Sequence, residues 1–195
     1  KHYAGLACEG VVDFVGLYDA DTARAKTIAA KYNVPVLASV GAAIAAAEAL
    51  NVVTPTFTHF DLASEILRSG RHVLVEKPMT DTTVQAAELV RLARENKCVL
   101  QVGHIERFNP VFDYLQNVAR EPRFIETHRL SPYPKRSLDI GVVLDLMIHD
   151  LDIVLAFVDS PLKSVDGVGV SVLSDSEDIA NARLKFENGC VANLT

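Results

Sequence analysis

Short apolar runs alternate with helix-length segments over the first half of the chain, and this alternation constrains the fold more than any other feature. The runs expected to form strands are residues 11–18, 34–37, 49–53, 72–75 and 99–102. They are rich in β-branched residues and are separated by segments with a helical pattern. Strands that alternate with helices predict βαβ units and therefore a doubly wound, Rossmann-like parallel sheet.

Capping residues support the helices placed between these strands. The expected helices are residues 22–32, 42–47, 58–69 and 80–96. Ser39 can cap the second helix, Thr80 can cap the fourth, and Gly70 provides a stop signal after the third. The tripeptide Glu76-Lys77-Pro78 closes the strand at residues 72–75 and is expected to open the long helix that follows.

The pattern changes after about residue 119 of the sequence. The later segments are a strand at 124–130, a loop at 131–136, an apolar helix at 142–158, two alternating runs at 165–173 and 179–186, and a strand at 190–194. Asn188-Gly189 is a hairpin signal between the last two strands. We therefore predict an α/β domain over residues 1–103, followed over residues 104–195 by part of an α+β domain with a largely antiparallel sheet.

Composition and charge exclude several classes of partner. The net charge of −6 is spread over interspersed acids and bases without a basic stripe, so we expect no nucleic acid partner. The longest apolar stretches are shorter than the roughly 20 residues that span a bilayer, so we expect no membrane partner. Cys8, Cys98 and Cys190 show no metal or redox spacing. They indicate reduced thiols, a cytoplasmic location and no metal site.

Asp19 follows the first predicted strand, where an acid in dinucleotide-binding folds bonds to the ribose hydroxyls of the cofactor. A helix cap is the alternative, and Asp21 can serve as that cap equally well. The glycine-rich fingerprint that precedes such an acid is not in the sequence, and residues 1–7 resemble the helix that follows it. We expect the first strand and its phosphate loop to lie outside this chain, which looks cut at both ends.

Three polar clusters follow predicted strands or lie on the apolar helix. They are Glu76-Lys77-Pro78, the segment from Gly103-His104 to Asn109-Pro110, and the pair Asp145 and His149. Together they supply a lysine, an arginine, a carboxylate and an imidazole, which can bind and deprotonate a polyol. In open α/β sheets, ligands bind beyond the carboxyl ends of the strands. The set predicts a dehydrogenase.

These motifs, with Thr54-Pro55-Thr56, resemble the glucose-fructose oxidoreductase, inositol dehydrogenase and MocA family. The resemblance extends over nearly the whole chain, and the segments 106–110 and 178–184 look most like members that act on nucleotide-linked amino sugars. It implies an enzyme that uses a nicotinamide cofactor, and the charge of Asp19, which would repel a 2′-phosphate, favours NAD over NADP. It also implies a sugar or nucleotide-sugar substrate and a homo-oligomer formed through the C-terminal sheet.

The resemblance assigns catalysis and substrate binding to Lys77, Asp145 and His149. His149 suits a general base because imidazole titrates near neutral pH, and Asp145 lies four residues earlier on the same helix face. There Asp145 can orient the imidazole or hold a substrate hydroxyl. Lys77 can donate to the reacting oxygen and stabilise its developing charge. The alternatives are a surface Asp/His pair and a solvated lysine at a helix start.

Further cofactor and substrate contacts are predicted at the strand ends. Glu76 is expected near the nicotinamide ribose, or else stabilises a helix start. Thr54, Pro55 and Thr56 are cofactor candidates, and capping is an equally good explanation of the threonines. His59 is counted with them, although for it, as for Asp61, a structural role is favoured.

Arg107 and Asn109 are predicted substrate contacts. Arginine suits a phosphate group because its guanidinium binds in a bidentate manner. An ion pair of Arg107 with Glu106 or a neighbouring acid is the alternative.

Two other functions remain open. A non-catalytic dinucleotide or sugar sensor with this fold would be stabilised by its ligand without producing NADH. A fragment with neither property would show no stabilisation by NAD.

Overall fold

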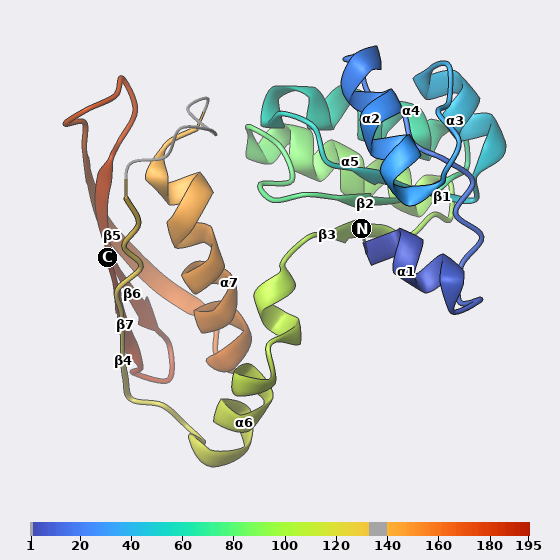
Figure 1. Cartoon of the computed structure of the whole chain (residues 1–195). Coiled ribbons are helices and arrows are strands. Elements are labelled where there is room, and N and C mark those ends of the chain that lie inside the picture. Colours follow the sequence, from blue (N-terminus) through green and yellow to red (C-terminus); the bar gives the residue numbers. More distant parts are fainter. Residues whose placement is uncertain (1, 133–139) are drawn as a thin grey trace. The chain divides into compact units, whose positions relative to one another are not determined.

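The computed structural model describes residues 2–132 and 140–195. The chain forms two compact units, each built from several stretches (Figure 1). The first unit comprises Lys1–Val52, Asp61–Leu74 and Ala87–Gln101, and the second comprises Val53–Phe60, Val75–Ala86 and Val102–Thr195. The boundary at residues 103 and 104 that the sequence predicts remains a prediction. Most of the predicted loop at residues 131–136 lies outside the described residues.

A parallel sheet of three strands in the order β1-β2-β3 carries the predicted Rossmann-like pattern. The strands are β1 (Ala49–Val52), β2 (His72–Val75) and β3 (Leu100–Val102). The helices of this region are α1 (His2–Cys8), α2 (Thr22–Tyr32), α3 (Val40–Ala46), α4 (His59–Arg68) and α5 (Thr83–Glu95), with a 3-10 turn, η1 (Thr56–Thr58), before α4. The doubly wound character that the sequence predicts is therefore confirmed.

Local capping explains where these helices begin and end. Asp21 accepts hydrogen bonds from two backbone N–H groups at the start of α2, and Ser39 accepts one at the start of α3. Gly70 follows α4 with a φ of 71°, which is the left-handed region that glycine reaches without strain.

The predicted strand at residues 11–18 is not a regular strand in the structure. A single isolated bridge pairs Leu17 with Val36, and this bridge is also the only pairing of the predicted strand at residues 34–37. Val11 and Val12, at the start of the first segment, are exposed. A strand needs a hydrogen-bonded neighbour along its length, and apolar composition does not supply one.

The prediction that Glu76-Lys77-Pro78 opens a helix is wrong. The chain leaves β2 at Val75, and α5 begins only at Thr83. Thr80 is not the cap either, because its hydroxyl donates to the Thr82 carbonyl, while the Thr82 hydroxyl accepts from the Gln85 N–H. Lys77 therefore lies in a loop, where its own backbone is not held by helical hydrogen bonds.

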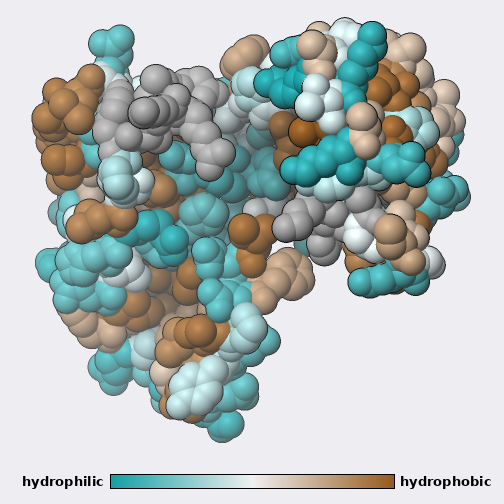
Figure 2. Space-filling view, in the orientation of Figure 1, coloured by the Kyte–Doolittle hydropathy of each residue, from teal (hydrophilic) through white to brown (hydrophobic). Residues whose placement is uncertain are grey.

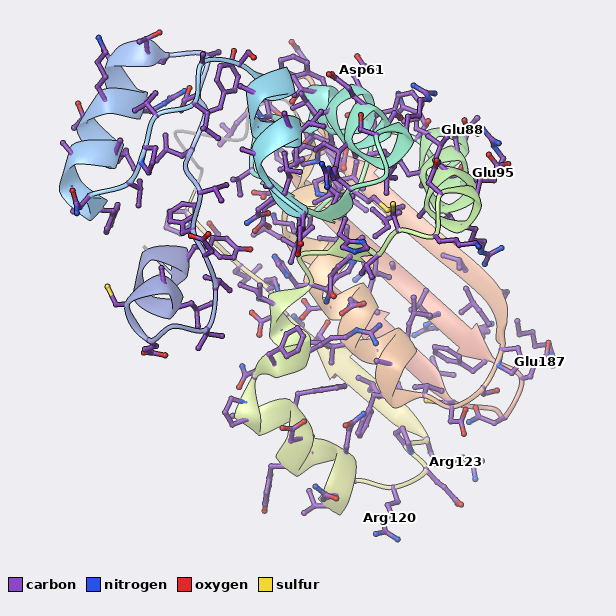
Figure 3. The ribbon with its side chains drawn as sticks, turned by 90° about the vertical axis from the view of Figure 1, so that its right-hand side faces the viewer. Asp61, Glu88, Glu95, Arg120, Arg123 and Glu187 are labelled. Atoms are coloured by element: carbon purple, nitrogen blue, oxygen red, sulfur yellow. The ribbon has the colours of Figure 1, made fainter. Side chains whose placement is uncertain are left out.

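Helix α5 of the first unit carries its charged residues on one side and its buried apolar residues on the other. Glu88 and Glu95 lie on its outer side and both pair with Arg91 at helical spacing (Figure 3). Leu89, Leu92 and Ala93 are buried on the other side. The helix thus separates a charged face from an apolar face.

The second unit contains a four-stranded sheet in the order β4-β7-β6-β5. Its strands are β4 (Phe124–Thr127), β5 (Leu162–Val170), β6 (Ile179–Phe186) and β7 (Val191–Leu194). The pairs β5–β6 and β6–β7 are antiparallel, whereas β4 pairs with β7 in parallel. The prediction of a largely antiparallel sheet is confirmed, with β4 as the exception.

One face of this sheet is covered by α7 (Ile148–Phe157), as Figure 1 shows. The shared core consists of Met147, Val154, Val158, Ala180, Leu184, Phe186, Cys190, Ala192 and Leu194. Alternate residues of β6 are buried there, as the alternating sequence pattern requires. The predicted turn is also present, because Gly189 has a φ of 84° and its N–H donates to the Phe186 carbonyl.

Two further helical segments precede this sheet, namely η2 (Ile105–Phe108) and α6 (Pro110–Val118). In the described part of the chain, no helix has the length and apolar character that crossing a membrane requires.

Candidate active site

Lys77 and Asp145 form the centre of the candidate site. The Lys77 ammonium donates to the Asp145 carboxylate at 2.8 Å and to the Asp145 backbone carbonyl at 2.7 Å. The two side chains are only 20% and 22% exposed. The predicted meeting of a lysine and a carboxylate from distant stretches is therefore present, within the second unit.

Asp145 lies on a π-helical segment, η3 (Val143–Met147), which leads directly into α7. The sequence predicts a continuous α-helix here, and that prediction missed the wider turn. In the structure the Asp145 carboxylate is bonded to Lys77, so its observed role is to hold the ammonium. Single π-helical turns inside helices occur frequently at functional sites.

His149 follows one turn later, at the second residue of α7. Burial lowers the pKa of its imidazole from the ordinary value of 6.5, and the positive charges of Lys77 and Arg129 lower it further. Glu106 and Asp150 act in the opposite direction. Within the described residues, the buried Nδ1 atom of His149 has no hydrogen-bond partner. The neutral ring that results is a proton acceptor.

Arg129 and Asp150 form an ion pair beside this histidine that the sequence analysis did not anticipate. The guanidinium donates to both carboxylate oxygens, at 3.0 and 2.8 Å, and the Asp150 side chain is only 9% exposed. A further oxygen of Glu106 lies 3.9 Å from the guanidinium. The available signal was the position of Asp150 next to His149 in an apolar helix, where a buried carboxylate needs a cation.

The predicted substrate contacts Arg107 and Asn109 are both bonded to other groups of the protein. Arg107 donates to both oxygens of Asp152 at 2.8 and 2.7 Å, so it forms an ion pair with a neighbouring acid other than Glu106. The Asn109 side chain accepts a hydrogen bond from the Val111 N–H and caps α6. Their binding of substrate remains a prediction.

Glu76 lies against Gly103, at the start of the segment that follows β3. A Cβ atom at Gly103 would lie 2.8 Å from a carboxylate oxygen of Glu76, closer than real side chains pack. The glycine therefore makes room for the Glu76 carboxylate at the carboxyl end of the strand.

The loop after β1 contains Thr54, Pro55 and Thr56. The Thr58 hydroxyl lies 2.6 Å from the Thr54 hydroxyl and donates to the Pro55 carbonyl at 2.8 Å. His59 is 1% exposed, and its two ring nitrogens each lie 2.9 Å from a backbone carbonyl oxygen, those of Pro78 and Thr54. The favoured structural role of His59 agrees with these contacts.

Asp19 belongs to the first unit, whereas the residues above belong to the second. Its carboxylate accepts hydrogen bonds from the Asp21 N–H and from Arg24, and it remains 28% exposed. Arg24 lowers the pKa of this carboxyl, so Asp19 is negatively charged at neutral pH. Asp21 is the residue that caps α2, which leaves Asp19 available for another role.

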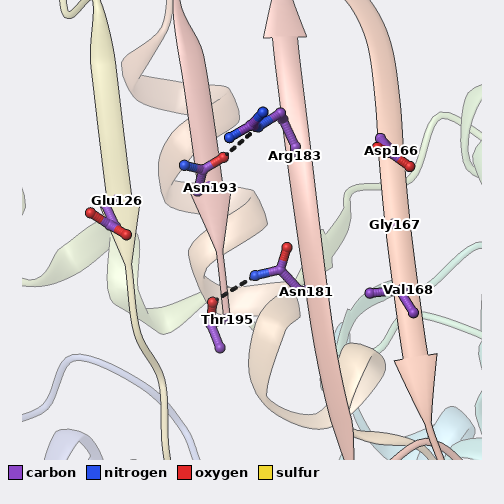
Figure 4. Close-up of a pocket in the computed structure, with 8 residues that line it drawn as sticks. All are labelled: Glu126, Asp166, Gly167, Val168, Asn181, Arg183, Asn193 and Thr195. Carbon is purple, nitrogen blue, oxygen red and sulfur yellow. Dashed lines mark hydrogen bonds between the residues drawn. The ribbon is translucent and has the colours of Figure 1, made fainter.

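No group of three or more histidine, cysteine or acidic side chains that could hold a metal ion occurs in residues 2–132 and 140–195. A hollow of about 310 Å³ lies on the sheet face opposite α7, and Figure 4 shows the side chains that line it. Arg183 donates to Asn193 across it, and Asn181 donates to Thr195.

A parallel sheet of the nucleotide-binding type and a partly buried lysine, carboxylate and histidine are features that dinucleotide-dependent oxidoreductases share. The chain belongs to the oxidoreductase family with an NAD-binding Rossmann fold, GFO_IDH_MocA, whose family model matches residues 2–104. The model of the GFO/IDH/MocA C-terminal domain matches residues 114–195. The family that the sequence motifs resemble is thereby confirmed.

Two curated relatives and one solved structure illustrate the similarity. UDP-N-acetylglucosamine 3-dehydrogenase of Acidithiobacillus ferrooxidans is 40% identical over 185 residues, which are 94% of this chain and 59% of that protein. A crystal structure of the same enzyme superimposes with a TM-score of 0.90 at 39% identity and covers 98% of this chain and 62% of its own. Inositol 2-dehydrogenase of Rhizobium meliloti is 30% identical over 151 residues, 71% of this chain and 45% of that protein. The chain thus spans about three fifths or less of these relatives.

Proposed function

We propose that the protein is an NAD-dependent dehydrogenase that oxidises a hydroxyl group of a sugar or nucleotide-sugar. The observation that carries this proposal is the hydrogen bond of 2.8 Å between the Lys77 ammonium and the Asp145 carboxylate. Asp145 lies four residues before His149, whose imidazole has a lowered pKa. The names of two relatives, a UDP-N-acetylglucosamine 3-dehydrogenase and an inositol 2-dehydrogenase, support a hydroxyl-rich substrate.

The residues of the chain fit the cofactor that the family binds. The partly exposed, ionised Asp19 carboxylate can accept hydrogen bonds from ribose hydroxyls, and its charge disfavours a 2′-phosphate, so NAD is preferred over NADP. Thr54, Pro55, Thr56 and Glu76 are the other candidate contacts, at the ends of β1 and β2. NAD, when bound, supplies the hydride acceptor.

The protein residues then have separate tasks. His149 accepts the hydroxyl proton, because burial and two nearby cations keep its imidazole neutral. Lys77 donates a hydrogen bond to the same oxygen and stabilises its developing negative charge. Asp145 positions Lys77 by accepting two of the three N–H donors of its ammonium, one at the carboxylate and one at the backbone carbonyl. The third N–H remains to donate to the substrate.

Arg107 and Asn109 remain the proposed substrate contacts of the second unit. The Arg107 guanidinium has donors in addition to the two that bind Asp152, so it can meet a phosphate or hydroxyl without leaving its partner. A nucleotide-linked substrate would use this bidentate geometry best.

The proposal is tested by Lys77→Ala in the full-length protein, with Lys26→Ala on the exposed face of α2 as the control. Sugar- and nucleotide-sugar-dependent NADH formation is followed by absorbance, and NAD binding by thermal shift. We expect kcat to fall about 100- to 1,000-fold in Lys77→Ala, with NAD stabilisation retained. Stabilisation by NAD without NADH formation on any sugar in the wild-type protein would instead identify a sensor, and unchanged turnover in Lys77→Ala would remove Lys77 from the mechanism.

We also propose that the protein associates with a second copy of itself through the sheet face opposite α7. The register places Val168, Val170 and Ile179 on this face, and they are 61%, 50% and 57% exposed. Figure 2 shows hydrophobic residues at the molecular surface in the upper part of this unit, among hydrophilic ones. Such exposed apolar residues beside an edge strand are usually covered in an assembly.

Light scattering on the full-length protein tests this association, with Val168→Lys as the variant and Val84→Lys on α5, which is also exposed, as the control. A wild-type mass of a single chain would contradict the proposal.

The reduced state of Cys8, Cys98 and Cys190 supports a cytoplasmic location, which fractionation of the host cell would test.

A further inference from the structure

His59 joins two loops that follow neighbouring strands of the parallel sheet. It is the first residue of α4, and its side chain is 1% exposed. Its Nε2 atom lies 2.9 Å from the Thr54 carbonyl, in the loop after β1, and its Nδ1 atom lies 2.9 Å from the Pro78 carbonyl, in the loop after β2. The ring is therefore a bridge between the two loops.

The chemistry of these contacts fixes the direction of the hydrogen bonds. Carbonyl oxygens only accept, so the imidazole must donate. The neutral ring donates to one of the two carbonyls, and the doubly protonated ring donates to both. In either form, each nitrogen faces a backbone oxygen, so no ring nitrogen is left to bind a cofactor.

The bridge matters because Pro78 directly follows Lys77. The loop between Val75 and Thr83 has no helical hydrogen bonds to hold it, whereas the far end of the Lys77 side chain is held by Asp145. On the other side, the Thr58 hydroxyl takes part in two hydrogen bonds with the Thr54 loop, to the Thr54 hydroxyl and the Pro55 carbonyl. His59 thus links the loop that carries Lys77 to a loop that has its own internal hydrogen bonds.

We propose that His59 is a positioning residue that fixes the backbone of Lys77, and that it acts on the reaction only through that lysine. The inference rests on the proposed function of Lys77. It replaces the idea of His59 as a cofactor ligand with a role that the contacts of its ring support.

The test uses the full-length protein with His59→Phe, which keeps a ring of similar size without nitrogens, and His59→Gln, which keeps one donor. His72→Phe is the matched control, because His72 is exposed on β2 and its Nδ1 accepts from the Val99 N–H. We expect kcat to fall about 10- to 100-fold in His59→Phe and less in His59→Gln. KM for NAD and for the sugar should change less than about threefold, since the ring binds neither.

Two readouts separate positioning from other roles. The rate at which Lys77 reacts with an amine-specific reagent, followed by mass spectrometry, should change in His59→Phe and not in His72→Phe, whether or not cofactor is present. In a Lys77→Ala background, His59→Phe should cause no further loss of kcat.

The outcomes distinguish this inference from the proposed function. If Lys77→Ala abolishes turnover but folded His59→Phe or His59→Gln keeps wild-type kcat and Lys77 reactivity, the positioning role is overturned and the proposed function stands. A raised KM for NAD with kcat restored at saturation would make His59 a cofactor ligand instead. If Lys77→Ala itself is fully active, the proposed function fails first.

Discussion

The two units of the chain use ion pairs in opposite ways. In the first unit, Asp19 pairs with Arg24 five residues away, and Arg91 pairs with Glu88 and Glu95 on the same helix. In the second unit, the pairs Lys77–Asp145, Arg107–Asp152 and Arg129–Asp150 join residues 68, 45 and 21 positions apart.

Burial separates the two sets of pairs further. The acids of the second unit are 22%, 10% and 9% exposed in these pairs, whereas Asp19, Glu88 and Glu95 of the first unit are 28%, 31% and 55% exposed. Exposed pairs at helical spacing contribute little because solvent screens them. Buried pairs contribute mainly through position, since removing one partner leaves an uncompensated charge. Loss of an ion pair should therefore lower the free energy of unfolding more in the second unit than in the first.

Asp145→Ala in the full-length protein should have the largest effect. Lys77 would lose the carboxylate that holds its ammonium, and we expect kcat to fall about 100-fold or more. Asp19→Ala, in the first unit, should leave kcat at saturating NAD within about threefold and raise KM for NAD instead. Steady-state kinetics on both variants checks this contrast, and equal losses of kcat would break it.

Arg129→Ala should be the most destabilising change of charge. It leaves the carboxylate of Asp150 buried without its cation, which costs about 3 kcal/mol of unfolding free energy. Arg24→Ala removes an exposed partner of Asp19 and should leave the unfolding midpoint in denaturant unchanged. Equal midpoints for the two variants would show that burial does not distinguish these pairs.

Gly141→Ala should be mildly destabilising in the second unit, by about 0.5–1.5 kcal/mol, because the Glu177 carboxylate can turn aside but then gives up its hydrogen bond. The new Cβ atom would overlap the Glu177 carboxylate, which accepts a hydrogen bond at 3.2 Å from the Val143 N–H at the start of the π-helical turn. Gly41→Ala, inside α3, meets only the Ser39 hydroxyl at 3.8 Å and should stabilise by up to about 1 kcal/mol. Thermal unfolding of both variants gives the two signs directly, and the same sign for both would contradict the packing seen at Gly141.

The smallest effect is expected from protonation of His149. Its pKa in the folded protein lies below 6.5, so the unfolded chain binds the proton first as the pH falls. Its contribution to stability is thus fully present above pH 6.5 and is lost as the pH falls through that value towards the folded pKa. The unfolding midpoint of the wild type should fall in acid relative to that of His149→Gln, and kcat/KM should decline with an apparent pKa below 6.5. An apparent pKa above 6.5 would mean that the histidine is stabilised as a cation.

The same contrast explains how far the sequence could predict the site. Residues 77, 145 and 149 were chosen because of their chemistry and their place in motifs, and the structure brings Lys77 and Asp145 into contact. The sequence did not predict that Asp145 would bind Lys77 instead of orienting the imidazole, because this pairing joins residues 68 positions apart. It also missed Arg129, whose partner Asp150 lies on another element.

The sequence by itself determined the order of most strands and helices, the caps at Asp21 and Ser39, and the turn at Gly189, because hydrogen bonds and periodicity within a few residues decide such features. Tertiary structure alone decided that residues 11–18 do not form a regular strand, that Lys77 lies in a loop, and that His59 joins two loops. Those outcomes depend on partners that are distant in sequence and on burial, which sets the strength of each charge and hydrogen bond.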